Sequence, residues 1–557
     1  MAKIVKRKIG GAGTGKTSQL LADLTQAREE LHLSPEEVGL CTFTRAGRAE
    51  LSTRAAAAWS TDVDRLTKTG WFRTAHSIAY KQLECSEGQM IQGKEGCEWL
   101  AKSLGCCLKT RYDARSNEQV FVDDGGGNGT AGTSLRAWEL ARSSHRPVAD
   151  ILGQWRLVGD VVPDLSVAKE YIERYERAKR KDGRCDFTDL VARFAGVKFV
   201  DGQPVDCEPE GEVPESLRAL AIDEAQDSSA LVDRVCRRLA NSPRMERVFL
   251  FGDPFQSVYS FGGSDFRHFM SWEAEEETMP RSYRCPPKVM ELGERCLRRM
   301  KSGYFDRGIK PAEHEGTVSR CLDAASAIEC IPSTGSVLIL GRCNFSLNDY
   351  ESILKMKGVP YSHVDRVGST KQLSGYSAWY ALEQGRPTLG EDVGNAIDMT
   401  VANHKEHGPL LRRGAKAEWA DGRMSDLDII LPKSDDYRLI GCTEIFEQLI
   451  RSGQWVDCLD AKYVERARQW RKAAVTYGED AATNPRVRLS TIHSAKGLEA
   501  DTVILSTISS PAVDRSRNRL VEAYDEECRV AYVAVTRTRR RLMLVDDGGY
   551  NRLEIPA

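Results

Sequence analysis

Near its N-terminus the chain reads Gly10-Gly11-Ala12-Gly13-Thr14-Gly15-Lys16-Thr17, which fits the phosphate-binding loop pattern G-x-x-x-x-G-K-[ST]. The basic, β-branched stretch Lys3 to Ile9 precedes this loop and predicts a strand, and the helical pattern of residues 18–24 follows it. Glycines let backbone N–H groups close around phosphate oxygens, and a helix that begins here points its positive end at them. The stretch predicts an α/β nucleotide-binding fold in which Ser18 is also in contact with the nucleotide. The alternative is a glycine-rich turn before a helix.

A second segment supplies paired carboxylates. The apolar run Leu220-Ala221-Ile222 leads directly into Asp223-Glu224-Ala225-Gln226-Asp227, the pattern of a buried strand that ends in acidic groups. In such a site Lys16 reaches the β- and γ-phosphate oxygens, Thr17 and Asp223 hold Mg²⁺, and Glu224 orients the attacking water. Together the two segments predict an enzyme that hydrolyses ATP with Mg²⁺ as cofactor.

Length and charge limit the remaining interpretations. A chain of 557 residues is too long for one domain and predicts about three or four. The formal net charge of −2 excludes a basic coat, so any contact with nucleic acid must lie in a local groove. The sixteen cysteines show no C-x-x-C spacing, which favours free thiols over a metal site. A charged N-terminus and the absence of long apolar runs predict a soluble, cytoplasmic protein with no membrane partner.

Further motifs are spread over nearly the whole chain. They are Thr42-Phe43-Thr44-Arg45-Ala46, Thr74-Ala75-His76-Ser77, Gly252-Asp253-Pro254-Phe255-Gln256-Ser257-Val258-Tyr259-Ser260-Phe261, Arg281-Ser282-Tyr283-Arg284, Thr491-Ile492-His493-Ser494-Ala495-Lys496-Gly497-Leu498-Glu499 and Ala531-Tyr532-Val533-Ala534-Val535-Thr536-Arg537. In this order and spacing the chain resembles the superfamily I DNA helicases of the UvrD/Rep/PcrA type. Its compact size is similar to that of phage- or plasmid-encoded members.

The resemblance implies an α/β architecture with two RecA-like P-loop NTPase cores, each a parallel sheet flanked by helices, and two mainly helical accessory insertions. The first core would be residues 1–83 and 186–275, with an insertion at 84–185. The second core would be residues 276–365 and 486–557, with an insertion at 366–485. ATP would lie between the cores, and single-stranded DNA would cross them.

The resemblance also implies an active site divided between the cores. Arg284 and Arg537 would deliver charge to the phosphates from the second core, and Gln256 would sense the γ-phosphate from the first, because phosphoryl transfer depends on positioning and charge stabilisation. Arg537 ends the amphipathic apolar run of residues 530–535; its alternative is a solvated surface charge. Tyr283 would stack on adenine, the alternative being core packing, and Glu499 would contact the ribose, the alternative being a surface carboxylate.

On the DNA side, aromatic rings can stack on any base. The residues that match the family's strand contacts are Phe43, Thr44, Arg45, His76, Ser77, Tyr259, Phe261 and His493. Tyr259 and Phe261 are two residues apart, so an extended segment would point both rings the same way. A single aromatic residue is more often part of a core than of a binding platform.

The function implied is an ATP-dependent helicase or translocase that moves 3′ to 5′ on single-stranded DNA. Its partners would be single strands, junctions between duplex and single strand, and replication or repair proteins. Two alternatives remain open: a DNA-stimulated translocase that displaces bound proteins and unwinds poorly, and a non-motor P-loop binding protein.

Three departures from the family's pattern matter. Where relatives carry an arginine in Trp/Phe-Arg-Gly-Ala, this chain has Gly262, and Arg45 replaces a usual asparagine. Family members also read the adenine edge with a glutamine upstream of the loop, and none of the residues before Gly10 is glutamine.

The missing glutamine generates a testable prediction. With the adenine edge unread, GTP and other purine triphosphates should support hydrolysis better than they do in a glutamine-containing relative. The measurement is kcat/KM for ATP and GTP in both proteins. Strict selectivity for ATP in this protein would contradict the prediction and indicate a different adenine contact.

Overall fold

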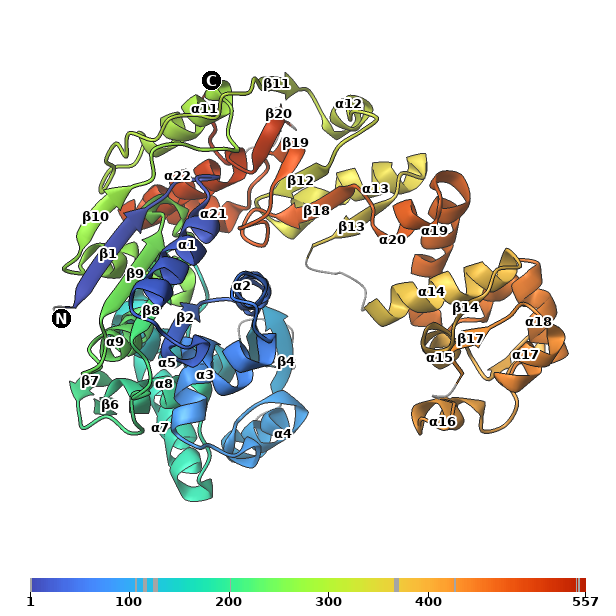
Figure 1. The fold of residues 1–557 in the computed structure, drawn as a ribbon, viewed down its shortest axis with the longest axis horizontal. Coiled ribbons are helices and arrows are strands. Elements are labelled where there is room, and N and C mark those ends of the chain that lie inside the picture. The colour runs from blue at the N-terminus through green and yellow to red at the C-terminus, as the bar shows by residue number, and fades with distance from the viewer. Residues whose placement is uncertain are drawn as a thin grey trace.

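Two six-stranded parallel sheets form the frame of the protein (Figure 1). The computed structural model describes residues 3–105, 108–113, 118–123, 129–200, 202–364, 370–424, 427–546, 548 and 551–556. For residues 45, 46, 87, 94, 108–113, 118–123 and 370 it describes the backbone but not the side chains. Helices cover both sheets, which confirms the predicted α/β class with two RecA-like cores. Within the described ranges, no helix combines the length and apolarity needed to cross a membrane.

The first core is built on the strand order β10-β1-β9-β8-β2-β3. Its strands are β1 (Ile4–Ile9), β2 (Val38–Thr42), β3 (Trp71–Thr74), β8 (Ala219–Ile222), β9 (Arg247–Gly252) and β10 (Glu275–Thr278). Its helices are α1 (Lys16–Glu30), α2 (Arg45–Ala58), α3 (Ala75–Gln82), α8 (Phe187–Ala195), α9 (Ala230–Ala240) and α10 (Phe266–Met270), and β6 (Val197–Val200) pairs with β7 (Gln203–Asp206).

Both faces of this first sheet are covered, which explains its apolar strands. Every residue of β2 and β8 is buried, as expected for parallel strands between helical layers. The helices α1 and α2 pack on one face, and α3, α8 and α9 pack on the other. Because all strands are parallel, the loops at their carboxyl ends share one edge of the sheet, where ligands bind in open α/β folds. The predicted phosphate loop and acidic residues follow β1 and β8 at that edge.

The second core has the strand order β11-β20-β19-β12-β18-β13, again parallel. Its strands are β11 (Thr317–Cys321), β12 (Val337–Gly341), β13 (Tyr361–His363), β18 (Val487–Thr491), β19 (Ala500–Ser506) and β20 (Thr538–Val545). Its helices are α11 (Pro287–Leu297), α12 (Ala324–Glu329), α13 (Asn348–Lys357), α21 (Pro511–Arg519) and α22 (Val521–Val535).

Helix α22 is the main link between the cores. Residues 530–535 were expected to form an amphipathic run, but this is wrong, because each is at most 1% exposed. The reason is that α22 packs against its own sheet and α11 while also meeting the first core. One apolar cluster joins α22 to Ala12, Phe255 and Val258. The two cores therefore share a buried apolar interface beside the phosphate loop.

The first accessory insertion lies between α3 and α8. It contains α4 (Gly93–Leu104), the antiparallel strands β4 (Leu108–Asp113) and β5 (Glu118–Asp123), α5 (Thr130–Ser144), α6 (Val148–Leu157) and α7 (Leu165–Asp182). A buried ionic cluster fixes it to the core: Arg142 and Lys179 pair with Asp186 and Asp189 at the start of α8. Asp186 also caps α8. Breaking such a buried cluster would leave uncompensated charge, so this contact holds the insertion against α8.

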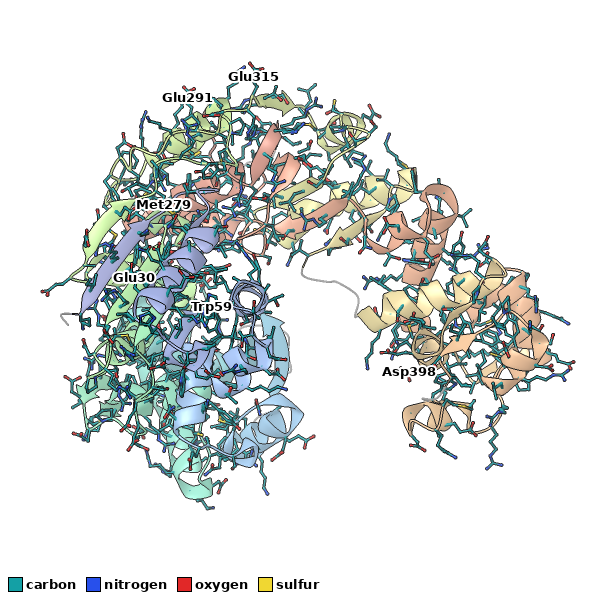
Figure 2. The ribbon with its side chains drawn as sticks, viewed as in Figure 1. Glu30, Trp59, Met279, Glu291, Glu315 and Asp398 are labelled. Atoms are coloured by element: carbon teal, nitrogen blue, oxygen red, sulfur yellow. The ribbon has the colours of Figure 1, made fainter. Side chains whose placement is uncertain are left out.

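The second accessory insertion stands apart from both sheets, at the right of Figure 1. Its helices are α14 (Thr370–Glu383), α15 (Gly390–Met399), α16 (Ala415–Ala420), α17 (Ser434–Leu439), α18 (Glu444–Arg451), α19 (Ala461–Tyr477) and α20 (Glu479–Thr483). Two-residue strands form the pairs β14 (Thr388–Leu389) with β17 (Ile429–Ile430) and β15 (Asn403–His404) with β16 (Gly408–Pro409). It has its own apolar core around Trp379 and Trp455; Asp398, labelled in Figure 2, belongs to α15.

Candidate nucleotide-binding and catalytic site

The phosphate loop joins β1 to α1, as the sequence predicted. Gly13 and Gly15 have φ of 69° and 81°, a left-handed conformation that glycine adopts without strain. A Cβ on Gly13 would lie 2.2 Å from the Cβ of Arg284, so this glycine also lets the second core approach. Met279, labelled in Figure 2, packs close to Gly10. The backbone of the loop therefore lies at the N-terminus of α1, a position where helices commonly bind anions.

Lys16 is the cation of the loop. Its ammonium donates to the carbonyl oxygens of Gly10 at 2.9 Å and Gly11 at 3.3 Å, and the Thr14 hydroxyl also donates to Gly11. The same ammonium acts to lower the pKa values of both Asp223 and Glu224, although other causes outweigh it at Asp223. Lys16 therefore lies between the loop and the two acidic residues.

The two acidic residues have opposite proton affinities. Burial and the adjacent Glu224 charge raise the pKa of Asp223 to about 7. Burial also acts to raise the pKa of Glu224, but the ammonium groups of Lys496 and Lys16 outweigh it and lower that pKa to about 2. Glu224 has a φ of 51°, which is uncommon outside glycine and typical of functional sites. Glu224 is therefore ionised at neutral pH and can orient a water molecule.

A divalent cation fits beside Asp223. Its Oδ1 is buried and has no hydrogen-bond partner among the described residues, so this oxygen is available to a cation. Thr17 lies in the first turn of α1, next to Lys16. Among the described residues there is no cluster of three acidic, histidine or cysteine side chains placed for a metal; Mg²⁺ needs none, because it commonly combines one or two protein ligands with substrate phosphates and water.

Gln256 lies at the contact between the cores. It ends a short 3-10 helix (Pro254–Gln256) after β9 and is 4% exposed. Its amide nitrogen donates to Asp253 at 2.9 Å, while its amide oxygen accepts from Arg537 at 3.3 Å. The predicted sensor of the first core is thus in direct contact with a predicted arginine of the second.

Arg537 is only 1% exposed, which excludes a solvated surface charge. Its guanidinium also donates to the carbonyl oxygens of Val533 and Leu498. Burial and the nearby Arg284 lower its pKa to about 10, so it remains charged at neutral pH. Arg284 donates to the Thr536 carbonyl at 3.4 Å and pairs with Glu499. The two predicted arginines therefore lie together beside the phosphate loop.

Tyr283 and Glu499 border this region. Tyr283 is 73% exposed, which contradicts the core-packing alternative. Its N–H donates to the Gly13 carbonyl at 2.8 Å, and its ring lies beside Gly15. Glu499 contacts Arg284 and Arg539, whose charges outweigh burial and lower the pKa of its carboxyl. Adenine stacking by Tyr283 and ribose binding by Glu499 remain predictions.

Lys496 lies in the motif of residues 491–499, but no functional role was predicted for it from the sequence. Its ammonium donates to the Gln256 carbonyl at 2.8 Å, pairs with Asp227, and lies 3.7 Å from Glu224. It also lies 5.1 Å from the ring centroid of Tyr259. Burial lowers the pKa of Lys496, but Asp227 and Glu224 outweigh burial and raise it. One charge from the second core thus contacts both the carboxylate of Glu224 and the ring of Tyr259, part of the predicted DNA platform.

Arg307 is the second missed residue. It is buried and pairs with Asp253 at 2.6 Å and Glu294 at 2.5 Å. Tyr532 contacts the same group and accepts a hydrogen bond from the Ala12 N–H at 3.2 Å. No motif marks residue 307; only the position of Asp253 in a quoted motif indicated this cluster.

The rings predicted to form the DNA platform lie close together, although their backbone differs from the expected one. Tyr259 and Phe261 were expected to lie in an extended segment, but residues 260–262 form a 3-10 helix. The turn still brings their ring centroids within 6.0 Å, and His493 lies 5.7 Å from Phe261. The Tyr259 hydroxyl donates to the His493 carbonyl at 3.0 Å. Phe261 is 37% exposed, so its ring is accessible to a base.

The other predicted strand contacts lie at the carboxyl ends of β2 and β3. Thr44 caps α2, and Phe43 is partly buried against the first core. His76 packs edge-on against Phe187, and burial lowers its pKa. Ser77 accepts a hydrogen bond from Arg73 at 3.1 Å. Arg45 begins α2, but its side chain lies outside the described residues.

Comparison with known proteins shows which family has this arrangement. Residues 8–276 match the family model of the UvrD/REP helicase N-terminal domain, and residues 467–546 match that of the UvrD-like helicase C-terminal domain. Together these cover more than half of the chain. The chain belongs to the UvrD/Rep helicase family. The predicted family is therefore confirmed, and so is the prediction that the protein is an ATP-hydrolysing enzyme of the helicase class.

Individual relatives are distant but similar over most of their length. The chain is 24% identical to the ATP-dependent DNA helicase UvrD2 of Mycobacterium tuberculosis, over 96% of this chain and 75% of the relative. It is 21% identical to the ATP-dependent DNA helicase PcrA of Bacillus subtilis, over 97% and 80%. It is 20% identical to the ATP-dependent DNA helicase Rep of Buchnera aphidicola, over 96% and 88%.

The position where this UvrD-type chain departs from the family pattern has its own local arrangement. Apart from its two chain neighbours, no described residue has an atom within 4 Å of a Cβ placed on Gly262. Next to it, the Ser260 N–H donates to Glu526 of α22 at 3.2 Å, and the Ser260 hydroxyl donates to the same carboxylate. The platform turn is therefore attached to the second core by Ser260.

The first prediction from this site concerns chemistry. Lys16→Ala should remove ATP hydrolysis because it loses the cation that bridges the phosphates, and Glu224→Gln because it loses the carboxylate that orients water. Glu224→Gln should still bind ATP. The measurements are ATP turnover and equilibrium nucleotide binding. Hydrolysis at the wild-type rate by Glu224→Gln would contradict the role of Glu224.

The second prediction concerns the two arginines. Arg284→Ala and Arg537→Ala should each lower kcat by about 10³-fold or more with comparatively intact nucleotide binding, because each removes charge needed mainly in the transition state. Arg295→Ala, an exposed residue of α11, is the control and should turn over normally. Near-normal turnover in either test variant would remove that arginine from the catalytic residues.

Proposed function

We propose that this protein is an ATP-driven motor that moves 3′ to 5′ along single-stranded DNA and separates duplex strands at junctions. The observation that carries the proposal is the position of Lys496, which contacts Glu224, Asp227 and Tyr259 at once. A group that contacts both the catalytic carboxylate and the strand platform can link hydrolysis to a change in grip. The direction of movement rests on the family resemblance.

The proposed division of the chain follows the two sheets. We assign residues 1–83 and 186–275 to the first core, and 276–365 and 486–557 to the second. Residues 84–185 and 366–485 are then the accessory insertions. The positions of α4 to α7 and of α14 to α20 support this division.

In the proposed cycle, the loop N–H groups and Lys16 bind the phosphates while Tyr283 stacks on the base. Glu224 holds the attacking water, and Gln256, Arg284 and Arg537 close on the γ-phosphate. Mg²⁺ held by Thr17 and Asp223 would neutralise phosphate charge. Once the γ-phosphate leaves, the contact of Arg537 and Lys496 with the first core is weakened, so the cores can separate and advance along the strand.

Two alternatives differ in measurable ways. A translocase that mainly displaces proteins would share all the contacts described above. A non-motor P-loop binding protein would not need the contact between Gln256 and Arg537, which argues against it.

Tailed duplexes test direction and unwinding together. A duplex with a 3′ single-stranded tail should be unwound with ATP, whereas one with a 5′ tail should not. Removal of streptavidin from biotinylated single strands, run in parallel, distinguishes the alternatives. Displacement without unwinding would favour the protein-displacing translocase, and equal unwinding of the 5′-tailed duplex would contradict the proposed direction.

A variant of the platform tests the DNA contact. A base–aromatic stack is worth about 1–3 kcal/mol, so Phe261→Ala should weaken single-strand affinity roughly ten- to a hundredfold. The salt dependence should hardly change, because stacking releases no counterions. Tyr477→Ala at the end of α19 removes a comparably exposed ring and is the control. Fluorescence anisotropy across a salt series measures both, and unchanged affinity in Phe261→Ala would contradict the platform.

A further inference from the structure

Two thiols meet where the first accessory insertion leaves and re-enters the first core. Cys85 lies in the loop after α3, and Cys185 lies directly before the cap of α8. Their sulfur atoms are 3.4 Å apart although the residues are separated by 100 positions in sequence.

Backbone hydrogen bonds hold the two segments together. The Ile91 N–H donates to the Cys185 carbonyl at 2.9 Å, and the Cys185 N–H donates to the Gln89 carbonyl at 2.9 Å. The sulfur atoms are therefore brought together by the fold itself. A disulfide needs an S–S distance of about 2.05 Å, so a small side-chain rotation would complete the bond.

The pair differs from a second close pair in its access to solvent. Cys85 is half-buried, and Cys185 is 8% exposed. Cys41 and Cys236 are also close, with sulfur atoms 4.0 Å apart, but they are 0% and 1% exposed. A small oxidant can reach Cys85 from solvent, whereas the second pair is enclosed in the core.

The surroundings of the pair indicate which thiol reacts first. Burial and the contact with Cys85 raise the pKa of Cys185 to about 12, so that thiol stays protonated. The guanidinium of Arg193 opposes this shift and lies within electrostatic reach of both sulfur atoms. Solvent reaches Cys85, which is half-buried, more readily than Cys185, which is 8% exposed. Cys85 is therefore the initial nucleophile.

We propose that Cys85 and Cys185 form a reversible disulfide when the protein meets a two-electron thiol oxidant such as hydrogen peroxide. The disulfide would form at the neck of the first accessory insertion, the point near residues 85 and 185 where the chain leaves and re-enters the first core. It does not depend on the proposed motor function.

The reaction balances with one peroxide. The Cys85 thiolate attacks one peroxide oxygen, the O–O bond breaks, and the released hydroxide takes up the thiol proton as water, which leaves a sulfenic acid on Cys85. The Cys185 sulfur then attacks the Cys85 sulfur. The S–O bond breaks, the S–S bond forms, and the leaving hydroxide accepts the Cys185 proton as a second water. Two thiols are oxidised by two electrons, and the peroxide is reduced.

The bond would tie the two ends of the insertion together. It closes a loop of about 100 residues, and it lies next to Asp186, the centre of the ionic cluster that holds α5 and α7 against α8. The oxidised protein should therefore keep the neck of the insertion closed. A thiol reductant should release it, because disulfides exchange with thiols.

Peptide mapping of the full-length protein tests the proposal. The protein is treated with hydrogen peroxide, remaining thiols are blocked with N-ethylmaleimide, and peptides are analysed by mass spectrometry before and after dithiothreitol. The expected product is a Cys85–Cys185 cross-linked peptide pair, lighter by two hydrogens and lost on reduction. Cys41 and Cys236 should be recovered as thiols, since no oxidant reaches them.

Matched variants complete the test. Cys85→Ser and Cys185→Ser should each abolish the cross-link, while Cys330→Ser, which removes an exposed thiol elsewhere, should retain it. In the oxidised wild type, protease cuts between residues 85 and 185 should leave fragments joined on a non-reducing gel. Sulfinic acid on Cys85 with Cys185 still reduced, oxidation confined to Met90, or pairing of Cys85 with another cysteine would each overturn the proposal.

Discussion

The buried ion pair between Asp253 and Arg307 is the contact on which the arrangement of the site depends. The two side chains are 0% and 1% exposed, and they come from different cores. The loss of one partner of such a pair typically costs about 3–5 kcal/mol, because the other charge is left buried and unpaired. The rings of Phe255 and Tyr532 flank the guanidinium at 4.6 and 5.1 Å. Charge and apolar packing thus fix the second core directly beside the phosphate loop.

This constraint explains how one site can be made from two parts. The first core provides the loop, the two acidic residues and Gln256, and the second provides Arg284, Lys496 and Arg537. Lys496 has an electrostatic role as well, because together with Lys16 it lowers the pKa of Glu224. The pKa of Asp223 stays raised. Glu224 is therefore held ionised partly by a charge from the other core. The low pKa of Glu224 therefore depends in part on its contact with the second core.

Local features of the sequence predicted an α/β nucleotide-binding core and the places of the phosphate loop and the acidic residues in it, whereas the second core was predicted only through the family resemblance. The strand before Gly10, the helix after it and the strand before Asp223 are set by neighbouring residues, and all three are present. The second half could be assigned only through the family resemblance, because Arg284 and Arg537 reach the loop through contacts made over hundreds of residues. Arg307 carries no local signal at all. The prediction of an extended segment at Tyr259 was wrong, because residues 260–262 form a turn in which Ser260 contacts α22.

In the proposed motor, contact with a single strand and hydrolysis of ATP are linked through the site that the two cores share. The most direct measurement is the steady-state rate of ATP hydrolysis at saturating ATP while single-stranded DNA is titrated. We expect the rate to rise and to saturate over the same DNA concentrations as strand binding measured separately. A rate that stays constant while DNA binds would contradict this link, since the rings at Tyr259 and the carboxylate of Glu224 would then act independently.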